Sequence, residues 1–145
     1  MSESSRIYQL ARNDLGLSET EGKGSNPRIA YAIKAAADWL DRDDSKTAWC
    51  GCIRGLWGIE TGTGVPKDHY RAISWLNWGT AIESLKDAEQ GDTIVFKRPG
   101  GFHVALLDSP YRDGDAKISV LGGNQSNSVS IAKYKVADIR GVRRG

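Results

Sequence analysis

The stretch G-D-T-I-V-F-K-R-P-G-G-F-H-V-A-L-L, residues 91–107, predicts two antiparallel strands joined by a tight turn. The first apolar run, 91–96, follows a turn signal, K-R-P-G-G forms the loop, and the second run, 102–107, returns beside the first. Three further runs of strand character follow: K-I-S-V-L (117–121), S-V-S-I-A-K-Y (128–134) and I-R-G-V (139–142). The second half of the chain therefore predicts an antiparallel sheet.

The first part of the chain has the period of helices instead. Ser4 or Ser5 is expected to cap a short helix that Gly16 stops. Asn26, which precedes a proline, is a good helix start. Apolar residues then recur at helical spacing through residues 28–40.

Two more helices are predicted before the sheet. One runs from Cys50 to about Trp57 and ends in a glycine-rich loop. Another is expected to be capped by Asp68 and to end at Gly79. Helices first and strands afterwards indicate an α+β fold with N-terminal helices packed on an antiparallel β-sheet.

The composition bounds the class of protein. A chain of 145 residues predicts a single domain over 1–145, and 39% hydrophobic with 26% charged residues is typical of a soluble globular protein. A net charge of +2 gives no case for nucleic-acid binding. No apolar run is long enough for membrane insertion, and the first residues lack the order of a signal peptide. We therefore expect synthesis in a cytoplasm, with another route to any target outside.

Both cysteines lie in T-A-W-C-G-C-I-R-G-L-W, residues 47–57. A disulfide between Cys50 and Cys52 is geometrically poor, and a metal site would lack a second pair of thiol ligands. At the first turn of a helix, unpaired amides and the helix dipole stabilise a thiolate. Cys50 is therefore a candidate nucleophile, although a small buried hydrophobe is the alternative.

A thiolate nucleophile needs a base, and the chain has only two histidines. His69 stands at the start of a predicted amphipathic helix, where a solvated capping role is expected. His103 opens a predicted strand after a glycine-rich turn, at the rim of the sheet. It is the candidate base, with a histidine bonded only to the backbone as the alternative.

A catalytic histidine is usually oriented by a third polar group. The candidates lie in G-G-N-Q-S-N, residues 122–127, where Asn124 or Gln125 ends the strand beside that of His103. An ordinary turn rich in glycine and asparagine is the alternative interpretation.

Five motifs in order resemble the CHAP-type papain-like peptidoglycan hydrolases (cysteine, histidine-dependent amidohydrolase/peptidase), in particular their compact phage endolysin branch. They are A-W-C, S-W-L-N-W-G, G-D-T-I-V-F, H-V-A-L-L and L-G-G-N-Q-S-N-S-V. An upstream element, Glu21, Gly24, Asn26, Pro27 and Ile29, also resembles that branch. The similarity covers about residues 21–129.

The resemblance implies a papain-like fold with Cys50 as nucleophile, His103 as base and then acid, and Asn124 as the orienting amide. Gln125 is the rival for that role and otherwise a substrate contact. The resemblance also implies a groove lined by Trp49 and Glu21. One departure is G-C-I-R-G after the nucleophile, which puts the neighbouring pocket in doubt.

The expected activity is hydrolysis of an amide bond in bacterial peptidoglycan, without a metal or organic cofactor. The protein would act as a monomer on the wall from the periplasm, after release from the host cytoplasm through a holin. The alternatives are a wall-binding module without turnover, an antibacterial effector and an amidase for a small non-wall amide.

Overall fold

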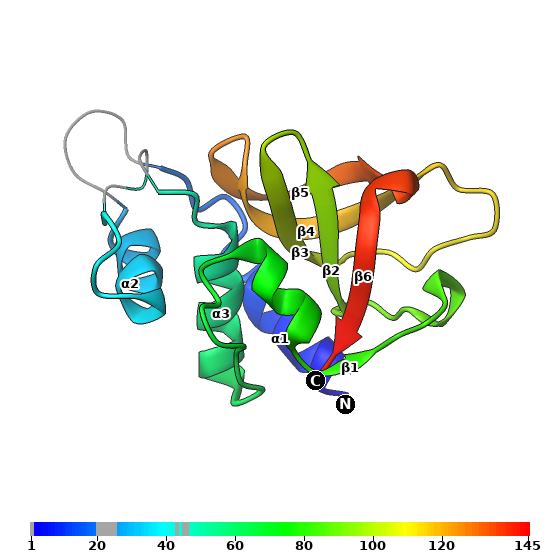
Figure 1. Ribbon diagram of the computed structural model, residues 1–145, viewed down its shortest axis with the longest axis horizontal. Helices are drawn as coiled ribbons and strands as arrows, with labels where there is room; N and C mark the ends of the chain where they lie inside the picture. Colours follow the sequence, from blue (N-terminus) through cyan, green and yellow to red (C-terminus); the bar gives the residue numbers. More distant parts are fainter. Residues whose placement is uncertain (1, 20–25, 43, 45–46) are drawn as a thin grey trace.

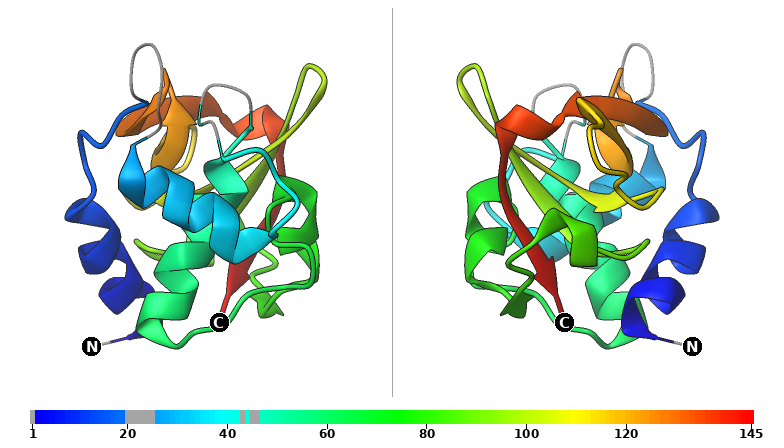
Figure 2. Two further views of the ribbon diagram at one scale, coloured as in Figure 1. Left: turned by 90° about the vertical axis from the view of Figure 1, so that its left-hand side faces the viewer. Right: turned by 90° about the vertical axis from the view of Figure 1, so that its right-hand side faces the viewer.

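The computed structural model describes residues 2–19, 26–42, 44 and 47–145. Three helices form one layer and an antiparallel sheet forms the other, so the α+β class expected from the sequence is confirmed (Figure 1). Both termini lie at the same end of the molecule (Figure 2). The helices are α1 (Glu3–Arg12), α2 (Pro27–Ala36) and α3 (Cys50–Thr61).

The sheet has six strands in the order β1-β6-β2-β3-β4-β5, and each neighbouring pair is antiparallel. The predicted hairpin is confirmed as β2 and β3, with Phe96 opposite His103. The last strand crosses back to pair with β2 and with a two-residue strand that the sequence did not suggest. The strands are β1 (Thr80–Ala81), β2 (Thr93–Arg98), β3 (Gly101–Leu107), β4 (Lys117–Gln125), β5 (Ser128–Lys135) and β6 (Ile139–Arg144).

Of two helix caps predicted from the sequence, the structure confirms one and contradicts the other. Asn26 caps α2 as predicted, and its side chain accepts hydrogen bonds from the amides of Arg28 and Ile29. The expected cap of α1 was wrong, because Ser2 is the cap and accepts from the amide of Ser5. Ser4 is buried and donates to Asp92 of the loop before β2.

The long helix expected from Asp68 to Gly79 is not formed. Asp68 has a φ of 55°, which a helix cap does not adopt, and only a short 3-10 helix, η1 (Ala72–Asn77), follows. Tertiary packing decides this segment, because Trp75 is fully buried and donates a hydrogen bond to the carbonyl of His69.

The sheet carries a core on each face. Strand residues alternate, so Leu106 and Leu121 pack against α1, α2 and α3, while Ala105 and Val120 pack in the cluster on the other face. That second cluster is closed by Ile94, Phe96 and Val142 from β2 and β6. The helices therefore pack on one face of the sheet, and the apolar side chains on the other face pack mainly against one another.

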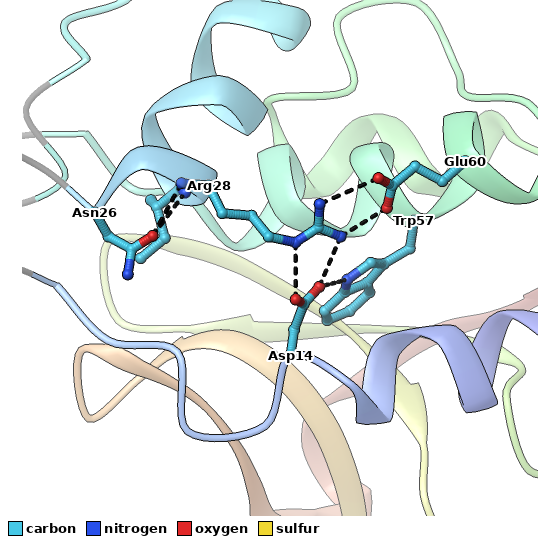
Figure 3. Close-up of polar contacts among 6 residues, drawn as sticks. Asp14, Asn26, Arg28, Trp57 and Glu60 are labelled. Atoms are coloured by element: carbon cyan, nitrogen blue, oxygen red, sulfur yellow. Dashed lines mark hydrogen bonds and ion pairs between the residues drawn. The ribbon is translucent and has the colours of Figure 1, made fainter.

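An ion network fixes the three helices relative to one another (Figure 3). Arg28 of α2 donates through Nε and Nη2 to both carboxylate oxygens of Asp14, at 2.8 and 2.9 Å, and also reaches Glu60 of α3. Trp57 of α3 donates its indole N–H to the same carboxylate of Asp14. The network holds α3, which carries Cys50, against α2 and the end of α1.

Candidate active site

Cys50 is the first residue of α3. Its preceding residue, Trp49, is the N-cap, and no described side chain caps this helix. The amides of the first helical turn have no intrahelical acceptor, and the helix dipole adds positive potential there. The start of α3 is therefore suited to stabilise negative charge on sulfur or on a developing oxyanion.

The glycines that follow Cys50 allow a loop to pack directly on α3. A side chain at Gly51 would meet the carbonyls of His69 and Tyr70, and one at Gly55 would meet the His69 imidazole ring. A side chain at Gly58 would meet the carbonyl of Gly64. The unusual G-C-I-R-G segment therefore forms a flat helix face against the loop 64–70.

His103 lies in β3 and is fully buried. Its Nε2 is 2.9 Å from Oε1 of Gln125. The amide nitrogen of Gln125 donates to the carbonyl of Ser130 at 2.7 Å, so the oxygen is the atom that faces the ring. His103 therefore donates its Nε2–H to Gln125, and Nδ1 is the nitrogen that can exchange a proton with another group.

Nδ1 of His103 has no hydrogen-bonding partner within the polar contacts of the described residues, and it is the ring nitrogen left for Cys50. Burial by itself raises the pKa of Cys50. The nearby His103, the backbone amide of Val104 and the charge of Arg98 outweigh burial and lower the pKa of Cys50 below its ordinary value. Cys50 and His103, paired in the sequence prediction, thus lie together.

The preference for Asn124 as the orienting amide is corrected to Gln125. The hydrogen bond to His103 comes from Gln125, and Asn124 sits in a left-handed turn with a φ of 58°. Pairing of β4 with β5 shifts between Gly122 and Gln125, where three steps along β4 match two along β5. This bulge adds one residue, so Gln125 reaches the face that simple alternation assigns to residue 124.

The two glycines before Asn124 both have a steric role. A side chain at Gly122 would collide with Oε1 of Gln125 and with Ala105. A side chain at Gly123 would collide with Ile53 and Trp49 of the α3 segment. One glycine therefore makes room for the orienting amide and the other lets α3 approach β4.

Three expected substrate contacts are corrected or lie outside the described residues. Trp49 is 0% exposed and donates its indole N–H to Glu19, so it supports the site from the core and does not line a groove. Gln125 is 4% exposed, and both ends of its amide are used inside the protein. Glu21 lies outside the described residues.

The second histidine is buried, contrary to the expected capping role. His69 lies against Gly55, and burial, with a smaller effect from the charge of Arg54, lowers the pKa of His69. Arg54 is itself buried one turn after Cys50, with its guanidinium over the rings of Trp75 and Trp78 and donating to Thr93. Trp75 lies in the core.

A cavity of about 310 Å³ opens beside His103, and the sequence did not predict its walls. Tyr134 of β5 stacks on the imidazole, with ring centroids 5.0 Å apart, and Phe96 stacks with Tyr134 in turn. Arg98, Lys97, Pro99 and Asp138 complete the lining. The period-two pattern of β5 gives a signal for Tyr134 facing the sheet interior, but not for its contact with His103.

Cys52 is buried and free, as is Cys50. Burial, and then the nearby Cys50, raises the pKa of Cys52 to about 12, so only Cys50 has the electrostatics of a nucleophile. Among the described residues, no three His, Cys, Asp or Glu side chains gather in a way that could hold a metal ion. Within the same residues, no helix has the length and apolar character needed to cross a bilayer.

The comparisons with known proteins leave the assignment of function to the geometry of the site. No protein-family model and no curated protein matches the chain.

Proposed function

We propose that this protein is a cysteine-dependent amide hydrolase with a papain-like fold of the CHAP type, acting on bacterial peptidoglycan. The observation that carries the proposal is the arrangement around His103. Nε2 is held by Gln125, Nδ1 is unpaired, and Cys50 lies beside the ring at the start of a helix.

The papain-like assignment has support from the order of the three groups along the fold. The thiol begins a helix that packs on the sheet, the histidine lies on β3, and the amide ends the adjacent strand β4. A cysteine, a histidine and an orienting amide in these roles are the working parts of cysteine hydrolases. A free cysteine kept only for packing would not need the other two.

The mechanism follows from which ring nitrogen of His103 is left free by Gln125. His103 takes the thiol proton on Nδ1, and the Cys50 thiolate attacks the carbonyl carbon of the amide. The negative oxygen of the tetrahedral intermediate is stabilised by amides at the start of α3. His103 then gives its proton to the leaving amine, and a thioester to Cys50 remains.

The second half of the cycle reuses the same groups. His103 removes a proton from water, the resulting hydroxide attacks the thioester, and collapse of the second intermediate returns the proton to the Cys50 sulfur. Gln125 keeps the imidazole in one tautomer and one orientation throughout. As a neutral amide it stabilises the imidazolium less than a carboxylate would.

The substrate class rests on the resemblance to wall hydrolases of the phage endolysin type. Within this proposal the protein reaches the wall from the host cytoplasm through a holin. The rival function is a wall-binding module of the same fold without turnover. The lowered pKa of Cys50 favours the hydrolase, because a binding module gains nothing from a reactive thiol.

The test is clearing of purified sacculi by the wild type, Cys50→Ala and His103→Ala, with mass spectrometry of the soluble products. Cys52→Ala is the matched control, since it removes the other buried thiol of the same helix. We expect clearing by the wild type and Cys52→Ala only. Clearing that survives Cys50→Ala would overturn the mechanism, and no clearing by a folded wild type would favour the binding module.

A further inference from the structure

Arg98 is an uncommitted cation beside the candidate active site. It ends β2, two residues after Phe96, so the two side chains share one face of the strand. Phe96 is the register partner of His103, which places Arg98 on the face of the sheet that carries the imidazole. Among the described residues, the Arg98 side chain has no hydrogen bond or ion pair.

Arg98 lines the cavity next to His103, where it could contact a bound ligand. Arg98, Tyr134 and Asp138 line it together with His103, and its volume of about 310 Å³ suits a short peptide segment. Lys97, although also in the lining, is held elsewhere: its ammonium donates to the carbonyls of Arg98 and Gly101. The guanidinium of Arg98 is thus the cation free to meet a ligand there.

We propose that Arg98 binds a carboxylate of the substrate, on the residue that flanks the amide bond to be cut. This inference rests on the proposed function. A guanidinium holds a carboxylate by two parallel hydrogen bonds, which fixes position as well as charge.

The amide bonds of the wall differ in whether a free carboxylate flanks them. An amide on either side of the stem-peptide glutamate is flanked by the free α-carboxylate of that residue. The amide between muramic acid and L-alanine is flanked by uncharged groups. Arg98 therefore favours peptide amides next to a free carboxylate over the amide between muramic acid and L-alanine. It is a specificity-determining residue that touches substrate.

The experiment uses two synthetic stem peptides that differ only at the glutamate, which carries either a free α-carboxylate or a carboxamide. For the wild type we expect kcat/KM to be roughly 10- to 100-fold higher with the carboxylate, the range of one charged hydrogen-bonding pair. Arg98→Gln removes a charge that helps to lower the pKa of Cys50, so it should slow both peptides, but it should slow the carboxylate peptide more and so lose the preference. Arg98→Lys should restore part of the preference. Arg112→Gln, a cation of a separate cavity, is the matched control and should behave as wild type.

The outcomes distinguish this inference from the proposed function. Equal hydrolysis of both peptides by the wild type, or an equal loss on both in Arg98→Gln, would overturn the role of Arg98 and leave the hydrolase intact. Hydrolysis of neither peptide nor sacculi by the wild type would overturn the proposed function. Calorimetric titration of both peptides into Cys50→Ala, with and without Arg98→Gln, then still decides whether Arg98 binds the carboxylate.

Discussion

Nε2 of His103 lies 2.9 Å from Oε1 of Gln125, and this hydrogen bond joins β3 to the end of β4 beside the start of α3. The far end of the amide is tied to Ser130 of β5. Three adjacent elements of the sheet thus fix one imidazole ring. Nδ1 of that ring has no partner among the polar contacts of the described residues and is available to Cys50. Substitution of Gln125 and labelling of Cys50 both test this arrangement.

Gln125→Ala should lower kcat about 100-fold, because the imidazole loses the partner that fixes its tautomer and orientation. Gln125→Glu should fall between the wild type and Gln125→Ala, because a carboxylate accepts from Nε2 but cannot donate to the Ser130 carbonyl. Asn124→Gly is the control at the neighbouring position, where glycine suits the positive φ. Steady-state kinetics on soluble wall fragments would measure all three. Near-normal turnover in Gln125→Ala with a large loss in Asn124→Gly would contradict the assignment.

Alkylation by iodoacetamide should be fast at Cys50 and should stay fast below the ordinary range of thiols. The pKa of Cys50 is lowered, so the thiolate persists until the pH falls through that lowered value, and the rate then drops. Cys52, with its pKa raised to about 12, should label slowly throughout. Labelling followed by peptide mass spectrometry, from about pH 4 to 9, measures both sites. His103→Ala should move the Cys50 midpoint to higher pH, and an unmoved midpoint would contradict the contact.

The same two thiols affect stability in opposite directions. Between the lowered pKa of Cys50 and the unfolded value of about 8.5, the native state binds fewer protons, so the free energy of unfolding rises with pH. Above about 8.5 the unfolded Cys52 ionises first, and that free energy falls as pH rises toward 12. Urea unfolding at several pH values, with Cys50→Ala and Cys52→Ala as controls, should show each slope disappear in turn.

Gly55→Ala should destabilise the protein by about 1–3 kcal/mol, because the added methyl group overlaps the buried His69 ring. The glycine face of α3 leaves no room for even a small side chain at this position. Gly101→Ala is the matched control, since nothing lies near a side chain added there. Denaturant unfolding measures both changes, and equal stability of the two variants would show that the loop 64–70 adjusts freely.

Asp14→Ala should destabilise the fold by about 2–3 kcal/mol, since Arg28 and the indole of Trp57 both lose a charged acceptor. Asp113→Ala removes a carboxylate from an ion pair with Lys86 in which both side chains are largely exposed. That control should change stability by less than about 1 kcal/mol. Thermal unfolding of both variants would test the network in Figure 3, and similar small losses would mean that it contributes little.

The sequence by itself determined the features that depend on short-range patterns. The change from helical spacing before residue 62 to alternation after residue 92 gave the α+β order, because side-chain period follows directly from backbone geometry. Asn26 and Pro27 gave the start of α2, and the helix expected to begin at Cys50 is α3. The hairpin of β2 and β3, with His103 near its turn, was also predicted from a short stretch of sequence.

Tertiary structure alone decided which side chains meet. Residues 118, 120 and 122 alternate toward the His103 face, and continued alternation would place there Asn124, the amide that the family resemblance implied. The single extra residue in the β4 bulge places Gln125 on that face in place of Asn124. No local sequence pattern predicts such a bulge. Trp49 and His69 were misjudged for a related reason. Burial depends on how closely distant segments approach, and Gly123 and Gly55 permit that approach without any signal in the sequence around the buried rings.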